Sequence, residues 1–425
     1  MSDKGKAQLV PKRRFPEFRG AAHWRLITLG EASIPVAERV GERKLTPVSI
    51  SAGIGFVPQT EKFGRDISGN QYQLYTLVRD GDFIYNKGNS LKFPEGCVYL
   101  LQGWGQVAAP NVFICFRLKD GYSNGFFQNC FEANSHGKQL KRHITSGARS
   151  NGLLNISKDA FFGVEIPTPT SAEQQKISDC LSSLDELIAA QTRKVDALKT
   201  HKKGLMQQLF PREGETQPRL RFPEFRDAED WVNSTLGAVF DTTSGGTPSR
   251  TELDYWDGNI PWITTSLVNF GVITEAEEYI SLAGLKNSSA KLLPKGAVLI
   301  AMYGQGKTRG QVALLGVEAT TNQACAAVLP KKGINPYFVF SNLAGRYEEF
   351  RRLSNSGGQE NLSQALVRDF PFAYPADAME QQRITNCLTS LGTLITATTQ
   401  ELETLKTHKK GLMQQLFPSA EAVEA

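Results

Sequence analysis

The chain has 425 residues, 40% of them hydrophobic and 21% charged, and its formal net charge is +5. This length suits two to four domains of ordinary globular composition. No apolar run nears the ~18 residues of a membrane span, and the N-terminus lacks a signal peptide. We therefore expect a cytoplasmic protein that does not enter a membrane. The six cysteines form no C-x-x-C pair and the five histidines lack zinc-ligand spacing, so neither a disulfide framework nor a metal site is expected.

The first segment, residues 1–165, is the cationic part of the chain. It contains 22 Lys and Arg against 14 Asp and Glu, a balance typical of a polyanion binder. Short runs such as "CVYLLQ" and "NVFICFRL" predict a mixed, strand-rich unit. The polar loops "YNKGNS" and "GKQLKRHITSGARSNG" carry Gly, Asn, Ser, Lys and Arg. Such loops can read a nucleic acid or can be solvated turns, and composition leaves both interpretations open.

The second segment, residues 166–212, predicts one long helix. Apolar side chains recur at alternating spacings of four and three, which is the a/d pattern of a coiled coil. Thr170 with Glu173 forms a capping box at the start, and Pro211 ends the run. About 39 residues of helix extend for roughly 58 Å. We expect this helix to pack on a second long helix, and the alternative is a core helix of one globular domain.

The third segment, residues 213–375, is also mixed and strand-rich but carries 15 Lys and Arg against 18 Asp and Glu. Its polar loops include "TSGGTPSR", "YGQGKTRG" and "NSGGQEN". The second loop is not a phosphate-binding P-loop, because the first glycine of G-x-x-x-x-G-K-[ST] would fall at Ala301. "NPYF" at Asn335 lacks the second proline of the N-P-P-Y motif that adenine methyl transfer requires. We therefore expect a chain that binds and does not catalyse.

The fourth segment, residues 376–425, repeats the second. The fourteen letters "LKTHKKGLMQQLFP" at 198–211 return at 405–418, a displacement of 207 residues. "RFPEFR" at 14–19 returns at the same displacement and "EQQKI" becomes "EQQRI", whereas the stretches between show almost no identity. The chain is therefore two tandem copies of one unit with constant ends and divergent middles, and a period this long makes each copy a domain.

The two expected helices share one heptad seam. The second helix has its own capping box, Asp377 with Glu380, and it also ends at a proline. Both helices are close to neutral, so we expect them to pack on each other and not to grip phosphates. The polar seam residues Gln191 and Thr398 are expected to set the register. The apolar seam residues are Ile177, Leu181, Leu184, Ile188, Val195, Leu198, Ile384, Leu388, Leu391, Ile395, Leu402 and Leu405.

The order of these segments resembles the DNA specificity subunit of type I restriction-modification systems, over nearly the whole chain. The most specific motifs are E-Q-Q-[KR]-I followed by the repeated helix end, and "GGTPSR…YW…IPWIT" in the third segment. The resemblance implies an α+β fold with two tandem α/β target recognition domains, 1–165 and 213–375. Two long antiparallel coiled-coil helices, in the conserved spacers 166–212 and 376–425, separate them, and the 207-residue repeat makes the arrangement pseudo-two-fold.

In such a system the chain reads a bipartite, asymmetric site on double-stranded DNA and is not itself catalytic. The resemblance implies two modification (adenine-N6 methyltransferase) subunits and two restriction (translocase and nuclease) subunits as partners. S-adenosylmethionine, ATP and Mg belong to those partners, and this chain holds no cofactor and no metal. A specificity component of another phage-defence methylation system, or a scaffold that does not read DNA, would share much of this architecture. From loop composition, the expected DNA-contacting residues are Asn86, Lys87, Ser90, Lys138, Lys141, Arg142, Arg149, Thr247, Arg250, Gln305, Lys307, Thr308, Arg309 and Gln359.

Overall fold

The chain divides by its contacts into two compact units. The first comprises residues 1–191 and 401–425, and the second comprises residues 192–400. The structure is a computed structural model, and the residues that it describes are 9–51, 53–88, 93–144, 154–212, 214–304, 307–355 and 361–418. Each unit holds one of the expected recognition domains together with parts of both long helices. None of the described helices is long and apolar enough to pass through a bilayer.

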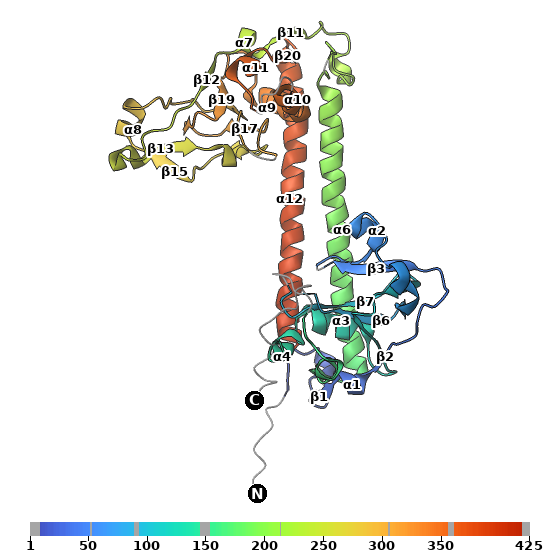
Figure 1. The fold of residues 1–425 in the computed structure, drawn as a ribbon. Helices are drawn as coiled ribbons and strands as arrows, with labels where there is room; N and C mark the ends of the chain where they lie inside the picture. The colour runs from blue at the N-terminus through green and yellow to red at the C-terminus, as the bar shows by residue number, and fades with distance from the viewer. Residues whose placement is uncertain are drawn as a thin grey trace. The chain divides into compact units, whose positions relative to one another are not determined.

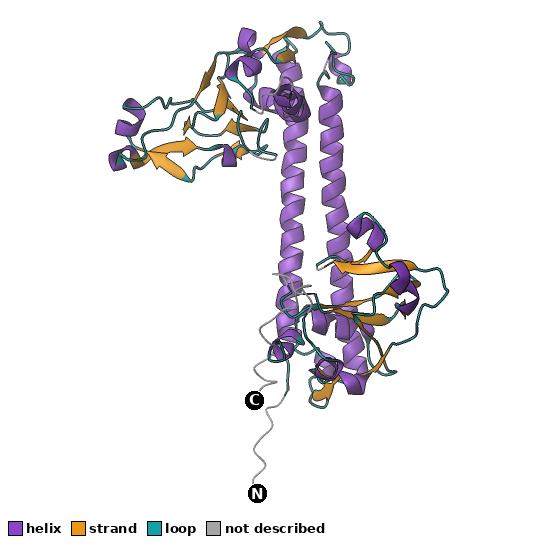
Figure 2. Ribbon diagram, in the orientation of Figure 1, coloured by secondary structure: helices purple, strands orange, loops and turns teal. Residues whose placement is uncertain are grey.

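Two helices of equal length, α6 (Ser171–Leu209) and α12 (Ala378–Leu416), are the longest elements of the chain, at 39 residues each. Figure 1 draws α6 in green and α12 in red, and Figure 2 shows that the bodies attached to them are rich in strands. The boundary between the units crosses both helices. The start of α6 and the end of α12 belong to the first unit, and the end of α6 and the start of α12 belong to the second.

The strand-rich body of the first unit contains two four-stranded sheets. One sheet has the order β2 (Ser33–Pro35), β9 (Ile114–Leu118), β6 (Asp82–Asn86), β7 (Cys97–Leu100), and the other has the order β4 (Gly55–Pro58), β3 (Thr46–Ser51), β8 (Gln106–Ala109), β5 (Thr76–Arg79). The helices of this body are α1 (Leu29–Ala32), α2 (Gln59–Phe63), α3 (Asn124–Glu132), α4 (Gly137–Lys141) and α5 (Lys158–Phe162), with 3-10 turns η1 (Pro16–Phe18) and η2 (Gly69–Leu74).

The body of the second unit contains sheets of five and three strands. The larger has the order β12 (Thr242–Ser244), β19 (Cys325–Val328), β16 (Val298–Ala301), β17 (Val312–Leu315), β14 (Val272–Ile273), and the smaller has the order β15 (Glu278–Ile280), β13 (Trp256–Ile263), β18 (Thr320–Thr321). The helices are α7 (Leu236–Val239), α8 (Leu282–Lys286), α9 (Pro336–Gly345), α10 (Tyr347–Asn355) and α11 (Gln364–Arg368), with 3-10 turns η3 (Pro223–Phe225), η4 (Leu253–Tyr255) and η5 (Thr265–Leu267).

The mixed helix and strand class expected from the sequence is confirmed, but the bodies are not α/β in the sense of alternating parallel units. Most strand pairs in the described residues are antiparallel, and parallel pairing is confined to β3–β8, β13–β18 and β14–β17. A short connection accounts for the antiparallel sense of the consecutive pairs β3–β4, β6–β7 and β16–β17, because strands joined by a few residues pair as hairpins. The expectation of α/β recognition domains is therefore corrected to α+β bodies.

A two-stranded antiparallel ladder closes each body at the same place in the repeat. In the first unit β1 (Arg25–Thr28) pairs with β10 (Glu165–Thr168). In the second unit β11 (Val232–Thr235) pairs with β20 (Pro371–Tyr374). Each ladder joins the entry of the body to its exit, immediately before the long helix. The divergent middle of each copy thus lies between two strands that occupy equivalent places in the repeat.

A buried ion pair fastens the "RFPEFR" segment to the start of each long helix. Arg14 Nε and Nη2 donate to the two carboxylate oxygens of Glu173 at 2.7 and 2.6 Å. Arg221 and Glu380 form the same fork at 2.8 Å for both bonds. Trp231 Nε1 adds a third donor to Glu380 at 3.2 Å. Both carboxylates are 1% exposed. They bind arginines 159 residues earlier in the chain, which are partners that the capping-box spacing does not indicate.

The first glutamine of "EQQ" attaches the long helix to a helix of the body. Gln174 Oε1 accepts the backbone N–H of Ser123, the N-cap of α3, at 3.0 Å. Gln381 Oε1 accepts the N–H of Asn335, the N-cap of α9, at 2.9 Å. Each amide nitrogen also donates to a proline carbonyl just before its long helix. The repeated motif therefore satisfies backbone groups that a helix N-terminus leaves without intrahelical partners.

The repeated "LFP" at the end of each long helix completes the core of the other copy's body. In the first unit Leu416 and Phe417 lie in one buried cluster with Trp24 and Phe126, and the Phe126 and Phe417 rings are 5.5 Å apart. In the second unit Leu209 and Phe210 lie in a cluster with Trp231. Each core therefore needs residues from both copies of the repeat.

The seam residues at the start of each long helix are core residues of the bodies. Ile177 and Leu181 belong to the buried cluster of the first unit, and Ile384 and Leu388 belong to that of the second. Val195 and Leu402 are also buried, and the remaining seam residues, Leu184, Ile188, Leu198, Leu391, Ile395 and Leu405, are half-buried. The first residues of each heptad pattern therefore pack on a body.

Candidate nucleic-acid interface

Helix α4 of the first unit presents the most compact group of cations among the sequence-predicted residues. Gln139 fixes this helix, because its side-chain amide accepts the Glu165 N–H at 3.0 Å and donates to the Glu165 carbonyl at 2.8 Å. Leu140 is fully buried beneath it. The structure brings three of the expected residues together on the opposite, exposed side of α4 and just after it: Lys138, Lys141 and Arg142.

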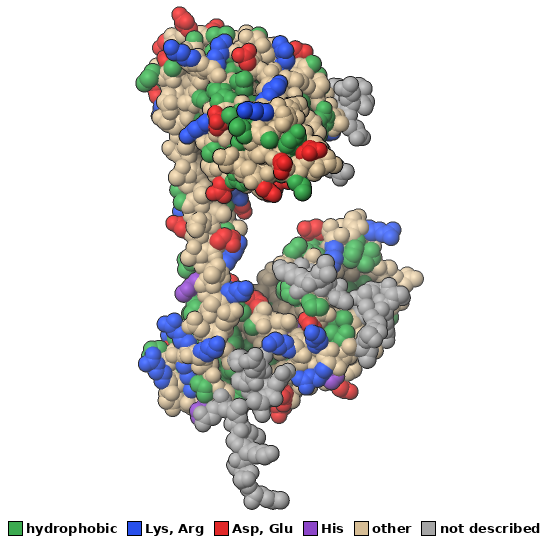
Figure 3. All heavy atoms as spheres, turned by 90° about the vertical axis from the view of Figure 1, so that its left-hand side faces the viewer, with side chains coloured by type: hydrophobic (Ala, Val, Ile, Leu, Met, Phe, Trp, Pro, Cys, Tyr) green, Lys and Arg blue, Asp and Glu red, His purple; other side chains and the backbone are tan. Residues whose placement is uncertain are grey.

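These cations line a surface hollow of about 770 Å³, together with His143 and Glu165. Burial lowers the pKa of the nearby His136 to about 4, so that imidazole is neutral at pH 7 and adds no charge. Figure 3 shows further Lys and Arg side chains on the surface of the first unit. The hollow is open and cationic, as a contact with a phosphate backbone requires.

Asn86 and Lys87 lie apart from α4, at the end of β6. Asn86 Oδ1 accepts the Gly88 N–H at 2.8 Å, and its amide nitrogen donates to the Ile50 carbonyl at 3.4 Å. Lys87 Nζ donates to the Ile156 carbonyl at 3.4 Å. Both side chains are half-buried. Their polar ends bind this unit's own backbone, which sequence composition could not indicate.

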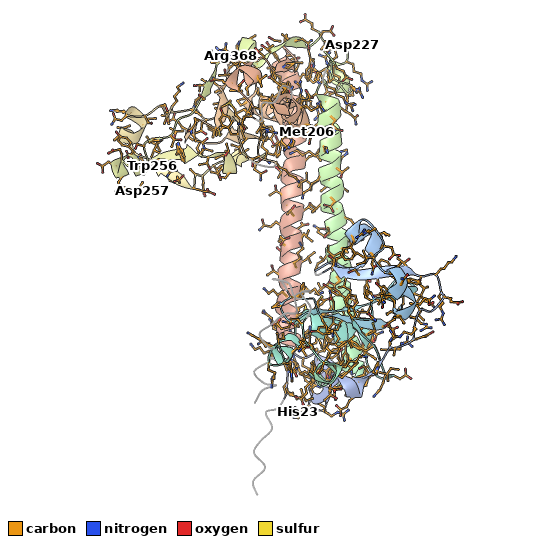
Figure 4. All side chains as sticks on the ribbon, viewed as in Figure 1. His23, Met206, Asp227, Trp256, Asp257 and Arg368 are labelled. Carbon is orange, nitrogen blue, oxygen red and sulfur yellow. The ribbon has the colours of Figure 1, made fainter. Side chains whose placement is uncertain are left out.

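Arg250 of the second unit is held by its neighbours in the structure. Its guanidinium forms a fork with Glu278 at 2.5 and 2.9 Å and stacks 3.7 Å above the Trp256 ring. The hydrogen bond to Glu278 raises the pKa of Arg250. Thr247, near the same end of the loop, donates to Gln323 at 2.6 Å. Figure 4 labels Trp256 and Asp257 on this part of the body.

The glycines of "TSGGTPSR" serve close packing. A Cβ added to Gly245 would lie 1.9 Å from the Thr321 carbonyl oxygen, and one added to Gly246 would lie 2.2 Å from Ser289 Oγ. The Gly246 N–H donates to the Thr321 carbonyl at 2.8 Å. Only glycine fits such contacts. The start of this loop is therefore packed against the body, a feature that its composition does not indicate.

The "YGQGKTRG" loop is anchored by α10. Tyr347 Oη donates to the Lys307 carbonyl at 2.6 Å, and the Phe270 ring packs edge-on to the Tyr347 ring at 5.2 Å. The Lys307 side chain is exposed, whereas Thr308 and Arg309 are half-buried. Lys307 is therefore the residue of this loop that is best placed to meet a ligand.

Four expected contact residues, Ser90, Arg149, Gln305 and Gln359, lie outside the described residues. The others fall into separate places, which are α4 and the end of β6 in the first unit and two loops of the second. Within the described ranges, no group of three or more His, Cys, Asp or Glu side chains is arranged to hold a metal ion.

A cationic groove of the second unit contains none of the residues expected from loop composition. The groove, of about 1300 Å³, is lined by Lys199, Lys202 and Lys203 of α6 and by arginines of the body. The net charge of α6 as a whole is close to neutral because its acidic residues, which all precede Ala197, balance these lysines. The net charge therefore gives no sign of a cationic end. The local spacing "KTHKK" is the signal that could have indicated these lysines.

Comparison with known proteins places the chain in a family. The family model for the type I restriction modification DNA specificity domain matches residues 74–200 and 228–407, well over half of the chain. The chain belongs to this family. The two matched stretches fall one in each copy of the repeat, and the second includes most of α12.

Curated members of the family align with parts of the chain. The type I restriction enzyme EcoR124I/EcoR124II specificity subunit of Escherichia coli is 30% identical over 184 residues, which are 42% of this chain and 45% of that protein. The type I restriction enzyme MjaVIII specificity subunit of Methanocaldococcus jannaschii is 24% identical over 289 residues, 66% of this chain and 67% of that protein. The alignment thus spans less than half the length of the E. coli relative.

Solved structures from type I systems share the fold. The crystal structure of the S subunit from M. genitalium superposes with a TM-score of 0.56 at 16% identity, over 97% of this chain and 100% of that chain. A chain from a study of complex assembly and conformational transition of the type I R-M system also gives 0.56 at 16% identity, over 93% and 98%. At these identities the likeness concerns the fold alone.

Proposed function

We propose that this chain is the DNA-reading subunit of a type I restriction-modification complex, and that each unit reads one half of a bipartite, asymmetric target on double-stranded DNA. The observation that carries the proposal is the contrast inside the repeat. The same arginine–glutamate ion pair and two-stranded ladder hold two bodies whose sheets differ in strand number and order. Unlike surfaces on a common support suit two unlike half-sites, because base edges differ from step to step along the major groove.

The charges support unequal contributions from the two bodies. In the first unit, Lys138, Lys141 and Arg142 are grouped at one hollow. In the second unit, the exposed Lys307 is the corresponding candidate. Phosphate contacts fix position and register, and base contacts fix sequence. We assign the α4 cations to phosphate contacts and leave base reading to the loops of each body.

The long helices are proposed to form an antiparallel coiled coil that spaces the two half-sites. Two contacts within the first unit support this arrangement. Lys409 binds Asp185, and Glu401 binds Gln191, so partners advance along α6 as they retreat along α12. The half-buried and buried seam residues between the body cores fit such packing.

The chemistry is proposed to reside on partner subunits. Two modification subunits would dock on the helices and supply adenine-N6 methylation from S-adenosylmethionine, and two restriction subunits would use ATP and Mg to cleave DNA. This chain would hold no cofactor and would act in the cytoplasm, where the DNA lies.

Exchange of the divergent middles tests this function. Replacing residues 238–367 by residues 31–160 gives both units the body of the first, while both arginine–glutamate ion pairs and both long helices remain. Mapping methylated adenines in cells that supply the modification subunit should then show a symmetric target built from one parental half-site twice. A scaffold that does not read DNA would give the parental methylation pattern, and that outcome would overturn the proposal.

A further inference from the structure

The repeat places the same lysine in two different electrostatic surroundings. Lys409 of the first unit lies 2.7 and 2.8 Å from the two Asp185 carboxylate oxygens and 3.0 Å from Glu132 Oε2. Burial alone lowers the pKa of Lys409, but the hydrogen bonds and charges of Asp185 and Glu132 outweigh it and raise the pKa overall. Its ammonium is therefore satisfied within the chain.

Lys202, the equivalent residue of the second unit, has no such acid. The position equivalent to Asp185 is Gly392, and a Cβ added there would lie 3.3 Å from Lys202 Nζ. Among the described residues, no hydrogen-bond or ion-pair partner of this ammonium is found. Lys202 is nevertheless half-buried, and burial lowers its pKa. A partly desolvated charge without a counter-charge is unfavourable in the free protein.

The Lys202 ammonium borders the cationic groove of the second unit. The lining includes six Lys and Arg side chains against two Glu. One of these, Glu349, already accepts hydrogen bonds from Arg346. Apolar side chains form the rest of the wall, among them Met206, Phe210 and Phe270. Figure 4 labels Met206 on α6 in this region. The groove thus combines positive charge with an apolar surface.

We propose that this groove docks an acidic, amphipathic segment of a modification subunit, whose carboxylate gives Lys202 the partner that Asp185 gives Lys409. The inference rests on the proposed docking of modification subunits. It goes further by making the two docking positions unequal. The matching hollow of the first unit, lined by Lys410, Met413 and Phe417, measures about 530 Å³, and Lys409 does not line it.

The apolar lining favours a protein segment over a nucleic-acid backbone. A phosphate strand gains from cations but gains nothing from Met206, Phe210 or Ile395. An amphipathic helix uses both kinds of surface, because its apolar face packs in a groove while its acidic residues meet the cations. Charge complementarity and burial thus point to the same occupant.

Gly392→Asp is the decisive variant, because it supplies the missing acid from within the chain. Lys202 then has an internal partner and should release the external one. We expect one of the two modification subunits to bind roughly tenfold or more weakly, with the other unchanged, in titrations of the full chain followed by calorimetry and native mass spectrometry. Gly392→Asn is the matched control of equal size without charge and should change neither affinity by more than about twofold. Lys202→Gln removes the ammonium and should weaken the same single site.

The outcomes separate the inference from the function on which it rests. If the unaltered chain binds no modification subunit, the proposed docking itself fails. If it binds two and Gly392→Asp and Lys202→Gln leave both affinities unchanged, the groove is not the docking site. An equal loss for Gly392→Asn would make the effect steric and overturn the role of charge. Weaker binding of a DNA duplex, with modification-subunit binding intact, would assign the groove to phosphates instead.

Discussion

In the first unit, β1 and β10 lead into two four-stranded sheets, whereas in the second unit β11 and β20 lead into sheets of five and three strands. The supports of these sheets are the same in kind. Each has an arginine fork on a buried glutamate, a glutamine on a helix N-cap and a phenylalanine from the other copy in its core. The comparison indicates that the repeated sequence segments attach each body to the long helices. The sequence between these segments can therefore differ between the two units.

The strongest test of this shared attachment removes the buried carboxylates. Glu173→Gln and Glu380→Gln each leave an arginine without its counter-charge, and because these arginine side chains are 8% and 14% exposed, the cost should be about 3 kcal/mol of unfolding free energy in the affected unit, the lower end for a broken buried pair. Hydrogen exchange of each unit's core amides in urea measures the loss. Lys176→Ala and Arg383→Ala, which break the exposed ion pairs to Glu17 and Glu224, should have far smaller effects. A large loss in one unit and none in the other would show that the two attachments are not equivalent.

A second test asks whether the long helices set the distance between the two half-sites while the two bodies set the half-site sequences. Four residues inserted after Thr192 and after Thr399 lengthen both helices by about 6 Å and restore roughly one turn. The spacer between the half-sites should grow by one or two base pairs, at about 3.4 Å each, with both half-sites unchanged. Mapping of methylated adenines reads the result. A single inserted residue turns later seam residues by about 100° and should abolish activity. A parental spacer in an active four-residue variant would show that the long helices do not set the distance between the half-sites.

A third test compares the two bodies as polyanion binders. Lys141→Ala with Arg142→Ala should flatten the dependence of DNA affinity on salt by up to about 0.9 for each phosphate that these side chains neutralise. Lys307→Ala in the second unit should change the slope by the equivalent of one phosphate at most. Arg43→Ala with Arg79→Ala deletes two cations that Glu38 already holds and serves as the control. An equal slope for the α4 variant and the unaltered chain would show that α4 does not touch the backbone.

The smallest expected effect concerns thiol reactivity. Cys180 and Cys387, equivalent in the repeat, are half-exposed, and the other four cysteines are buried. Burial raises the pKa of Cys97 and Cys325 to about 11 and that of Cys115 to about 12. At pH 8, iodoacetamide should label Cys180 and Cys387 first and at similar rates, as read by mass spectrometry. Labelling in urea, where all six should react, is the control, and early labelling of Cys115 would contradict its burial.

The same thiols predict a loss of stability at alkaline pH. In the unfolded chain a thiol ionises near pH 8.5, whereas the buried thiols keep their protons in the folded state. The unfolded state is therefore favoured as the pH rises through about 8.5 and towards the folded-state values. Replacing Cys115 by Ser removes this contribution, and its alkaline unfolding curve should fall less steeply. A curve as steep as that of the unaltered chain would contradict the assignment.

The sequence predicted the long helices well because their signals are local. The heptad spacing and the flanking prolines place both helices, and the structure begins and ends them at Ser171–Leu209 and Ala378–Leu416. Local signals were incomplete, since Glu173 and Glu380 match a capping box by spacing and their carboxylates also bind arginines far away in the chain. Periodicity carries no information about a partner 159 residues distant.

Candidate binding residues were harder to predict, because composition does not distinguish a loop that is open from one that is packed. Arg250 has the composition of a DNA contact yet is fixed by Glu278 and Trp256. Lys202 lies in a helix judged near-neutral as a whole, yet it borders a cationic groove of about 1300 Å³. The role of Lys202 depends on which residue lies beside its ammonium. The structure provides this information, because Asp185 lies beside Lys409 and Gly392 lies beside Lys202.

The end of each long helix completes the core of the other copy's body. The two units therefore become complete at different times during synthesis. The second unit is one continuous stretch, residues 192–400, whereas the first needs residues 401–418 to place Leu416 and Phe417 against Trp24. A ribosome therefore releases everything that the second unit needs while the first still has an open core. An interrupted product that stops near residue 400 would carry one finished body and one with its aromatic residues exposed, and such a surface is what chaperones and proteases recognise. The chain is thus built so that its earliest-made body is the last to close.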